Sequence, residues 1–541
     1  MVHLEKYTNS YVNIILEGEG TYNNSISKID KYFAKHPDGY MFTPRWKNRR
    51  FTHWDGKVHL LKCVKDDYNI LPLGLVKDLI HFLQEKNIEF TCSKDIGTCF
   101  FSDKNHDFES FYSWVENTSG LSPRDYQRRM LELALKHKRQ CYRAATGAGK
   151  TLTLYMIGRY LLNHNKNFRI LLIVPNIGLV TQTYNNFKDD YNWTDLDKDV
   201  GMIYGKLEKE EKEESLKKSF VISTWQSLQK YVKSDPEYFL RYNCVLLDEM
   251  HTAKNEEGVI NSIMRLAENA EYRIGVTGTI PKNDLYVNTL IGNFGDIKQI
   301  ISTKELIDRG ELTKAFIHEV RINYTENSVK YLRKAKIKRD TEYELVHNCH
   351  STDYAIGELI KKGYIKKDQN TLILMRMVAN KEMSEMVDYI KENFPDFHVE
   401  IVNGKIDFEK REEIRTGVEK NKGEIIVATY KTFGVGINMK NLHNVIFASS
   451  TKSYVDTLQS IGRGLRLHKS KQATQIFDIN HNLSIEINKH DGTKDYWRSY
   501  LNKDFASEGK SRLAYYIEEK HPIDYIQIDK TFDLLEGLNV S

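Results

Sequence analysis

The sequence lacks the features of a secreted, membrane-bound or zinc-stabilised protein. Its six cysteines include no Cys-x-x-Cys pair, so neither structural disulfides nor a zinc site is expected. No apolar run is long enough to cross a bilayer, and the first twelve residues lack the apolar core of a signal peptide. We therefore expect a soluble cytoplasmic protein without a membrane partner.

An excess of charge of either sign is also missing. The chain has 79 basic and 74 acidic residues, and its formal net charge is +5. A uniformly basic body is therefore excluded, and any nucleic-acid surface must be a local groove whose affinity falls with salt. The length of 541 residues and the hydrophobic content of 40% suffice for three or four domains.

The most informative segment that is present is a run of small residues ending in Gly-Lys-Thr. In such a loop the backbone amides surround a triphosphate, the lysine contacts its β- and γ-phosphates, and the threonine hydroxyl binds Mg²⁺. A strand-like run at 140–144 leads into the loop and an apolar helix-like run at 152–157 follows it. The sequence therefore predicts a nucleotide and Mg²⁺ site formed by Ala144, Ala145, Thr146, Gly147, Ala148, Gly149, Lys150 and Thr151.

A second part of this site follows later in the chain. An apolar, strand-like run at 244–247 ends in Asp248 and Glu249. We expect Asp248 to hold Mg²⁺ through water and Glu249 to polarise the water that attacks the γ-phosphate, which implies hydrolysis rather than binding alone. The alternative, that both acids merely end a surface strand, is disfavoured by the matching phosphate loop.

Other segments lie where a nucleic-acid motor would need them. Arg124 can stack on adenine and the Gln127 amide can pair with its edge, which would select ATP. The runs 173–182 and 221–227 are strands with hydroxyl and amide side chains at their ends, suited to a sugar-phosphate backbone, although each alone would be an ordinary strand end. The run 274–279 closes on hydroxyls and could link hydrolysis to that groove.

The second half of the chain repeats the strand–helix alternation without a phosphate loop, which predicts a second doubly wound α/β lobe. At its end, Arg463 and Arg466 have helical i, i+3 spacing, so both guanidinium groups could reach the γ-phosphate. The alternative for such a pair is a solvated helix face. The strand-like runs of this lobe are 371–375, 399–402, 424–429 and 444–448.

In this order the motifs resemble those of the superfamily-two helicases and translocases. The resemblance implies α/β architecture with two tandem RecA-like, doubly wound parallel-sheet lobes, and ATP and Mg²⁺ as cofactors. Two departures are Asn438, where many relatives carry aspartate, and Met250, where many carry alanine or cysteine. The resemblance implies that His251, Thr277 and Thr279 couple hydrolysis to motion. It also implies that Gly436 lies near the ribose and that Gln459 faces the γ-phosphate. The residues that it implies for contact with the nucleic-acid backbone are Thr181, Thr224 and Thr429.

The N-terminal runs 38–46, 53–61 and 71–75 resemble the amino-terminal module of phage UvsW-type recombination helicases. That resemblance implies a small α+β module that assists DNA binding. It also implies an ATP-dependent DNA helicase that remodels Holliday junctions, stalled forks, D-loops and R-loops. The expected partner is thus branched or forked DNA, with RNA–DNA hybrids as a further substrate, and the expected enzyme is a monomer in the host cytoplasm if a phage encodes it.

Cations and aromatic residues alternate in this N-terminal module. We expect Arg45, Lys47, Arg49 and Arg50 to contact DNA phosphates while bases stack on the tryptophans between and after them. The alternative is a basic hairpin whose tryptophans pack into a small core, and the sequence leaves both open.

We expect four parts: an accessory DNA-binding module at 1–120, an ATP-binding lobe at 121–315, a second lobe at 316–480 and a helical C-terminal appendix at 481–541. Three other functions would use part of the same pattern. A non-motor ATP-dependent switch would not need arginines on a second lobe, and a restriction-type translocase subunit would need a nuclease or recruiting domain. An RNA helicase stays open, because contacts with phosphates do not report a 2′-hydroxyl.

Overall fold

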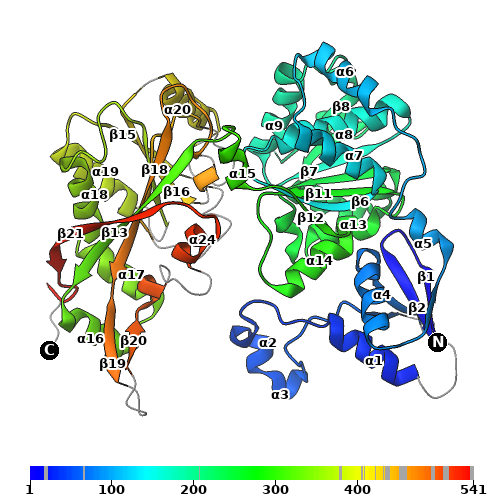
Figure 1. Ribbon diagram of the computed structural model, residues 1–541, viewed down its shortest axis with the longest axis horizontal. Coiled ribbons are helices and arrows are strands. Elements are labelled where there is room, and N and C mark those ends of the chain that lie inside the picture. The colour runs from blue at the N-terminus through cyan, green and yellow to red at the C-terminus, as the bar shows by residue number, and fades with distance from the viewer. Residues whose placement is uncertain are drawn as a thin grey trace. The chain divides into compact units, whose positions relative to one another are not determined.

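The computed structural model contains two compact units, Met1–Ser302 and Thr303–Ser541 (Figure 1). Each has a seven-stranded parallel sheet, and the first also has a smaller mixed sheet. Among the described residues, no helix is long and apolar enough to span a membrane. The structure describes residues 1–16, 22–64, 68–205, 207–376, 381–403, 406, 408–420, 422–430, 432, 439–449, 460–462, 464–488, 494–503 and 511–536.

The N-terminal sheet has five strands in the order β3-β4-β2-β1-β5, with β1 and β5 parallel and the other neighbours antiparallel. Helix α4 has an apolar face because Val76, Leu79 and Leu83 recur at helical spacing, and all three are buried in the core of this sheet. The elements are β1 Val2–Lys6, β2 Tyr11–Leu16, α1 Tyr22–Phe33, η1 Tyr40–Phe42, α2 Pro44–Lys47, α3 Arg49–Thr52, β3 Lys62–Val64, β4 Tyr68–Pro72, η3 Leu73–Leu75, α4 Val76–Glu85, β5 Phe90–Cys92, α5 Lys94–Thr98 and α6 Phe108–Ser119.

The core of the N-terminal sheet is completed by a helix from the next part of the chain. Leu285, on helix α14 (Asp284–Phe294), is 3% exposed and belongs to this core, and Ile291 packs against it. The backbones approach closely here, since a Cβ atom on Gly74 would lie 1.8 Å from the carbonyl oxygen of Ile291. The N-terminal sheet is therefore fixed to the large sheet of the first unit.

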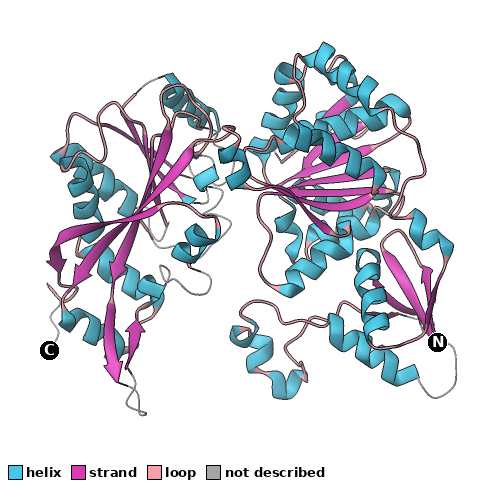
Figure 2. Ribbon diagram, viewed as in Figure 1, coloured by secondary structure: helices cyan, strands magenta, loops and turns pink. Residues whose placement is uncertain are grey.

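The large sheet of the first unit has the order β12-β6-β11-β10-β7-β9-β8, and Figure 2 shows helices on both of its faces. Strand β7 reads Ile-Leu-Leu-Ile-Val and is buried throughout, as expected for a parallel strand covered on both faces. The elements are α7 Asp125–Lys136, β6 Arg139–Ala144, α8 Lys150–His164, β7 Ile170–Val174, α9 Ile177–Asn185, η4 Asn186–Asp190, α10 Leu196–Asp199, β8 Val200–Ile203, α11 Lys209–Ser215, β9 Phe220–Thr224, α12 Trp225–Ser234, η5 Pro236–Arg241, β10 Cys244–Asp248, η6 Met250–Lys254, α13 Val259–Leu266, β11 Tyr272–Thr277 and β12 Ile297–Ile301.

The second unit has a parallel sheet of the order β15-β16-β14-β17-β18-β13-β21 and a separate hairpin of β19 and β20. The two parallel sheets confirm the predicted pair of doubly wound lobes. The elements are α15 Thr303–Asp308, β13 Lys314–Tyr324, α16 Glu326–Ala335, α17 Arg339–Asn348, α18 Ser351–Lys361, β14 Thr371–Met375, α19 Lys381–Asn393, β15 His398–Val402, α20 Phe408–Lys420, β16 Glu424–Thr429, β17 Asn444–Phe447, β18 Ala473–Asn482, β19 Ser484–Asn488, β20 Lys494–Arg498, α23 Tyr500–Lys503, α24 Arg512–Glu518 and β21 Ile523–Phe532.

The expectation of a helical appendix at 481–541 is wrong for most of its described residues. Two strands of this segment form a hairpin, and β21 is an edge strand of the lobe sheet, paired in parallel with β13. The physical reason is an alternating pattern: Ile526 and Ile528 are buried while Tyr525 and Gln527 are exposed. Only the short helices α23 and α24 fit the expectation.

Candidate active site

The predicted motifs of the first lobe meet at one edge of its sheet. The phosphate loop follows β6, the acids end β10, and the hydroxyl-rich run ends β11, and these three strands are neighbours. The next strands along, β7 and β9, end in the segments expected to contact nucleic acid. Because all are parallel, their carboxyl ends lie at the same edge, which is where open α/β sheets bind ligands.

The phosphate loop has the backbone that its sequence requires. Gly147 and Gly149 have φ angles of 91° and 75°, in the left-handed region that favours glycine, and Lys150 then begins helix α8. The Lys150 ammonium donates to the carbonyl oxygen of Ala144 at 3.3 Å. The loop thus directs the first amides of a long helix and one cation toward the same place, as phosphate binding demands.

Gln127 is attached to the phosphate loop. Its side-chain oxygen accepts from the backbone amide of Arg124 at 3.0 Å, and its amide nitrogen donates to the carbonyl of Ala148 at 2.9 Å. The Arg124 guanidinium is exposed and donates to the hydroxyl of Tyr126 at 2.8 Å. Adenine pairing by Gln127 stays a prediction, and it would require the amide to leave Ala148.

Asp248 and Glu249 form an acidic pair at the end of β10, and both residues are half-buried. Burial and the charge of Glu249 raise the pKa of Asp248 to about 6. For Glu249, burial is outweighed by the hydrogen bond from His251 and the charge of Lys150, so its pKa falls to about 2. Carboxylate oxygens are ligands that Mg²⁺ prefers, and Thr151 lies in the first turn of α8, so the predicted Mg²⁺ ligands stay a prediction that this geometry allows.

The backbone at Glu249 is unusual. Its φ angle is 50°, a left-handed conformation that a non-glycine residue adopts at the cost of strain. Glu249 joins β10 to η6, and its carboxylate accepts from the Thr277 hydroxyl of the next motif. Strain concentrated at a carboxylate of this kind is typical of a functional position.

His251, Thr277 and Glu249 are in contact, as the predicted coupling role requires. The Thr277 hydroxyl lies 3.1 Å from Glu249 Oε2 and 2.8 Å from His251 Nδ1, and His251 Nδ1 lies 3.3 Å from Glu249 Oε2. The backbone amide of Thr279 donates to the Thr277 hydroxyl at 3.3 Å. These contacts connect the Glu249 carboxylate to the loop after β11, and the coupling role itself stays a prediction.

Met250, which departs from the family pattern, is accommodated by Gly275. Met250 is fully buried, and a Cβ atom on Gly275 would lie 2.8 Å from its sulfur. Gly275 was not predicted as the partner of Met250, although a glycine inside an apolar strand is a signal of close approach. The larger side chain thus fills space that glycine leaves open.

In the second unit, Arg466 is half-buried just after a short helical stretch. The end of that stretch is held by residues that the sequence analysis missed: Thr313 donates its amide and its hydroxyl to the Leu465 carbonyl at 2.8 and 3.0 Å, and the Thr474 hydroxyl donates to the Gly464 carbonyl at 2.7 Å. Three residues predicted for the same site lie outside the described residues: Gly436, Gln459 and Arg463.

The threonines expected to contact the nucleic-acid backbone differ in accessibility. Thr181 is half-buried on α9, whereas Thr224 and Thr429 are 2% and 5% exposed. The Thr224 hydroxyl caps α12 by accepting from the amide of Ser227 at 3.3 Å. The Thr429 hydroxyl likewise accepts from the amide of Thr432 at 3.1 Å. Their contacts with nucleic acid stay predictions, and in this structure each hydroxyl accepts from the backbone amide three residues later.

The N-terminal tryptophans pack against arginines. The Arg45 guanidinium lies 4.9 Å from the Trp54 ring centre and the Arg49 guanidinium 4.4 Å from that of Trp46, and the two indoles meet edge to face at 6.5 Å. This arrangement favours the small-core alternative for the tryptophans. The four predicted cations, Arg45, Lys47, Arg49 and Arg50, are all exposed.

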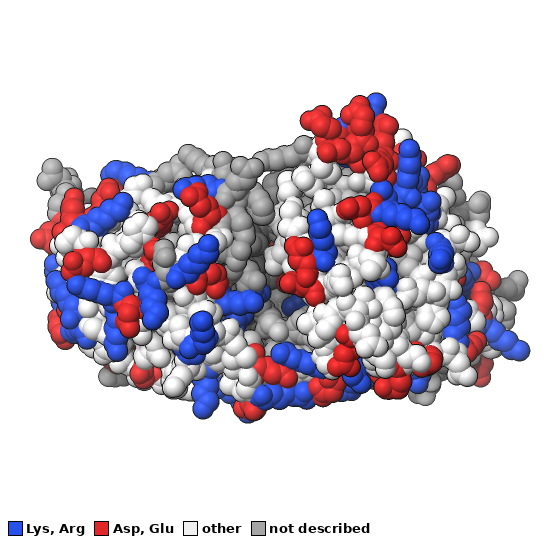
Figure 3. Space-filling model, turned by 90° about the horizontal axis from the view of Figure 1, so that it is seen from above, with Lys and Arg blue, Asp and Glu red and all other residues white. Residues whose placement is uncertain are grey.

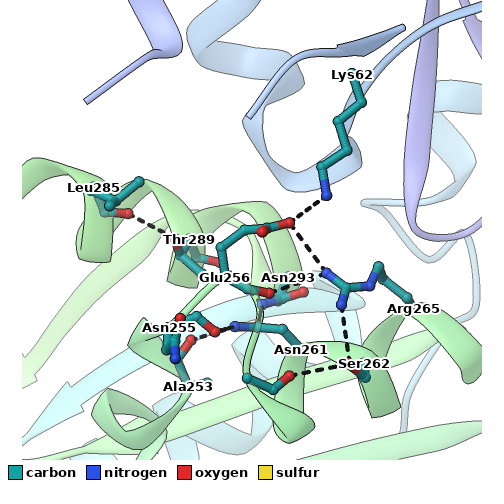
Figure 4. Close-up of polar contacts among 11 residues, drawn as sticks. Lys62, Ala253, Asn255, Glu256, Asn261, Ser262, Arg265, Leu285, Thr289 and Asn293 are labelled. Atoms are coloured by element: carbon teal, nitrogen blue, oxygen red, sulfur yellow. Dashed lines mark hydrogen bonds and ion pairs between the residues drawn. The ribbon is translucent and has the colours of Figure 1, made fainter. Parts of the chain in front are cut away.

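The segment after Asp248 and Glu249 is tied to the N-terminal sheet (Figure 4). Lys62 of β3 lies 2.5 Å from Glu256 Oε1, and the Arg265 guanidinium lies 3.3 Å from the same oxygen. Asn261 donates to the Ala253 carbonyl at 2.9 Å and thereby holds the end of η6, the short helix that begins one residue after Glu249. Glu256 therefore connects the N-terminal sheet directly to the segment 248–256, which we call the acid-bearing loop.

Comparison with known families agrees with this geometry. The matching family models are the res subunit of type III restriction enzymes at residues 120–282, the helicase conserved C-terminal domain at residues 354–468, and the N-terminal domain of the DNA helicase UvsW at residues 2–93. The fold and the site thus define an ATP-hydrolysing superfamily-two DNA helicase. The ATP-dependent DNA helicase uvsW of enterobacteria phage T4 is 30% identical over 524 residues, which cover 96% of this chain and 97% of that protein. The chain belongs to the UvsW family of ATP-dependent DNA helicases, as the resemblance of its motifs predicts.

Other relatives share parts of the chain. The DNA 3'-5' translocase XPB2 of Sulfurisphaera tokodaii is 26% identical over 398 residues, covering 69% of this chain and 82% of that protein. A crystal structure of T4 UvsW aligns with 99% of this chain and 100% of that chain, at 25% identity and a TM-score of 0.47. The DNA-bound helicase MrfA aligns with 71% of this chain and 52% of that chain, at 15% identity and a TM-score of 0.53, which shows a shared fold.

Proposed function

We propose that this helicase couples ATP hydrolysis to the remodelling of branched DNA, namely four-way junctions, stalled forks, D-loops and R-loops, in recombination, repair and replication. The observation that carries the proposal is the fixed N-terminal sheet. It is held to the ATP-binding lobe by Leu285 in its core and by the ion pair of Lys62 and Glu256. Because the N-terminal module is fixed to the ATP-binding lobe, its surface would stay in contact with a DNA branch point while the enzyme moves along DNA. The cations proposed to contact DNA, Arg45, Lys47, Arg49 and Arg50, lie on the segment between α1 and β3 of the same module.

Charge is distributed in a way that fits a local DNA site. Acidic and basic side chains are mixed over most of the face drawn in Figure 3, apart from a group of acidic side chains at its upper right edge, in keeping with the small net charge of +5. DNA affinity would then come from a few phosphate contacts and fall with salt. The further DNA contacts that we propose are Thr181, Thr224 and Thr429, and we infer a monomer that works in the cytoplasm.

In the proposed hydrolysis step, each residue of the site has its own task. Lys150 and the amides of the loop hold the β- and γ-phosphates, and the Glu249 carboxylate orients and polarises the attacking water. Its pKa of about 2 keeps Glu249 ionised at neutral pH. Mg²⁺ bound by Thr151 and Asp248 would neutralise charge on the phosphates. Arg466, with Arg463 and Gln459, is proposed to stabilise the transferring phosphoryl group.

The proposed coupling route starts from Glu249. Water attack and phosphate release change the charge next to this carboxylate, which His251 and Thr277 contact. Thr277 ends β11 and His251 lies in η6, so the end of β11 and the short helix η6 would respond together. The segment after η6 is also connected to the N-terminal sheet, through the ion pair of Glu256 with Lys62.

The experiment that tests the function is ATP turnover of the wild type and of Glu249→Gln, at one fixed salt concentration, with single-stranded DNA, duplex DNA, a four-way junction, an R-loop or duplex RNA. We expect the junction or the R-loop to stimulate turnover most, and Glu249→Gln to lower it about 100-fold or more while nucleotide and DNA still bind. Stimulation by RNA alone would replace the proposal with an RNA helicase, and stimulation by no nucleic acid would replace it with an ATP-dependent switch.

A further inference from the structure

A ladder of aromatic rings anchors the segment between α1 and β3. The rings of His36 and Tyr40 stack at 4.2 Å, Tyr40 meets Trp46 edge to face at 5.0 Å, and Trp46 meets Trp54. Gly56 lies under the ladder, since a Cβ atom there would be 2.8 Å from the Tyr40 ring. The tryptophans that the sequence offers for base stacking are therefore used to build the segment.

The same ladder leaves other apolar side chains outside. Phe51 is 87% exposed, Phe42 is 78% exposed and Met41 is 56% exposed, and no residue of α2 or α3 is buried. Figure 1 shows α2 and α3 as a pair of short helices away from the strands of the N-terminal sheet. Isolated exposed apolar residues are common, but two phenylalanines this exposed on one short segment indicate a binding surface.

The charge around these side chains has one sign. Residues 39–54 contain four cations and no carboxylate. Lys47 and Arg50 make no ion pair with any residue that the structure describes. A partner of this surface must therefore supply negative charge together with flat apolar faces, which is the chemistry of a nucleic-acid strand with unpaired bases.

We propose that Phe51, assisted by Phe42, stacks on unpaired bases at the point where branched DNA opens, while Lys47 and Arg50 bind the flanking phosphates. The proposal rests on the proposed function and adds the substrate feature that the N-terminal segment recognises, an unpaired base. Stacking tolerates any sequence because every base has a π-face, which suits an enzyme that moves along DNA.

The test is equilibrium binding of the full-length protein, without nucleotide, to labelled oligothymidine, an abasic strand of equal length and a blunt duplex, each across a salt series. Phe51→Ala should weaken binding to oligothymidine about five- to 150-fold, leave the abasic strand and the duplex unchanged, and keep the salt dependence of the wild type. Arg50→Gln should instead weaken all three and lower the slope of log K against log[salt] by about 1.

The controls separate stacking from folding and from protein contacts. Phe51→Trp should retain affinity for oligothymidine, and Phe101→Ala, at a 43% exposed phenylalanine outside the segment, should bind like the wild type. Equal binding of oligothymidine by Phe51→Ala and the wild type would overturn the proposal. So would an equal loss for all three probes, or a change in sedimentation that assigns the surface to a second copy of the chain. Failure of branched DNA to stimulate turnover would overturn the proposed function alone, because this binding test involves no ATP.

Discussion

The two ends of the chain are attached to their lobes in opposite ways. The N-terminal residues form a sheet of their own, and lobe residues such as Leu285 enter its core. The C-terminal residues add a strand, β21, to the sheet of the lobe itself. The first arrangement adds a new surface to a finished motor lobe, and the second makes the lobe depend on the end of the chain.

Buried guanidinium groups show the same contrast. Arg273, beside the N-terminal sheet, is 1% exposed and donates to the Ser10 hydroxyl at 3.1 Å and the Ala267 carbonyl at 2.9 Å. Arg512, at the C-terminal end, is 1% exposed and forms an ion pair of 2.7 Å with Asp478, which is fully buried. Neutral acceptors therefore bind the buried guanidinium beside the N-terminal sheet, whereas a buried charge pair fixes the C-terminal helix α24.

The largest loss of stability is expected when the ion pair of Arg512 and Asp478 is broken. Arg512→Met leaves the Asp478 carboxylate buried without its cation, so we expect the free energy of unfolding of the second unit to fall by about 3–5 kcal/mol. Hydrogen exchange in β13 and β18 measures the loss. Adding Asp478→Leu to Arg512→Met should recover much of it, and unchanged exchange in the single variant would contradict an essential pair.

A substitution in the ATP-binding lobe tests how the N-terminal sheet is attached to it. Leu285→Ala removes a buried side chain from the shared core and should destabilise it by about 2–5 kcal/mol. Faster exchange is expected in β1, β2 and α4, although the substituted residue belongs to α14. Leu240→Ala, at a position 38% exposed, is the matched control. If exchange in β1 and β2 stays slow, the N-terminal sheet does not need the lobe.

The stability of the second unit should depend on pH through the buried His481. Burial, with a smaller contribution from Arg512, lowers the pKa of His481 to about 3. Between pH 6.5 and 3 the unfolded chain binds a proton at this site that the folded unit does not, so stability falls as pH falls, by about 1.4 kcal/mol per pH unit. His481→Gln should flatten this slope in denaturant unfolding followed at several pH values. A slope equal to that of the wild type would assign the acid sensitivity to other groups.

The smallest stability effect is expected at Lys62. Its ion pair with Glu256 is partly exposed, so Lys62→Met should change the free energy of unfolding by no more than about 1 kcal/mol. Stimulation of ATP turnover by branched DNA should nevertheless fall, because the pair connects the N-terminal sheet to the acid-bearing loop. Lys209→Met, at an exposed pair with Glu213, is the control. Normal stimulation in Lys62→Met would show that the pair carries no signal.

The sequence predicted those parts of the site that directly follow a strand along the chain. The phosphate loop, the acids after β10 and the hydroxyls after β11 follow apolar strands, and parallel strands must bring their ends together. It did not predict the attachment of Gln127 to Ala148 or the packing of Met250 over Gly275, because these contacts depend on how distant segments meet. The C-terminal strands were missed for the same reason, since the pairing of β21 with β13 is invisible in either segment alone.

The completion of the N-terminal core by α14 also has a consequence for biosynthesis. The strands of this sheet leave the ribosome before α14, and Leu285 follows them on the order of ten seconds or more later at usual rates of translation. During that interval the apolar face that α14 will cover is open to the cell. A chaperone that binds short apolar segments would have its earliest and longest access here, before any part of the motor has formed.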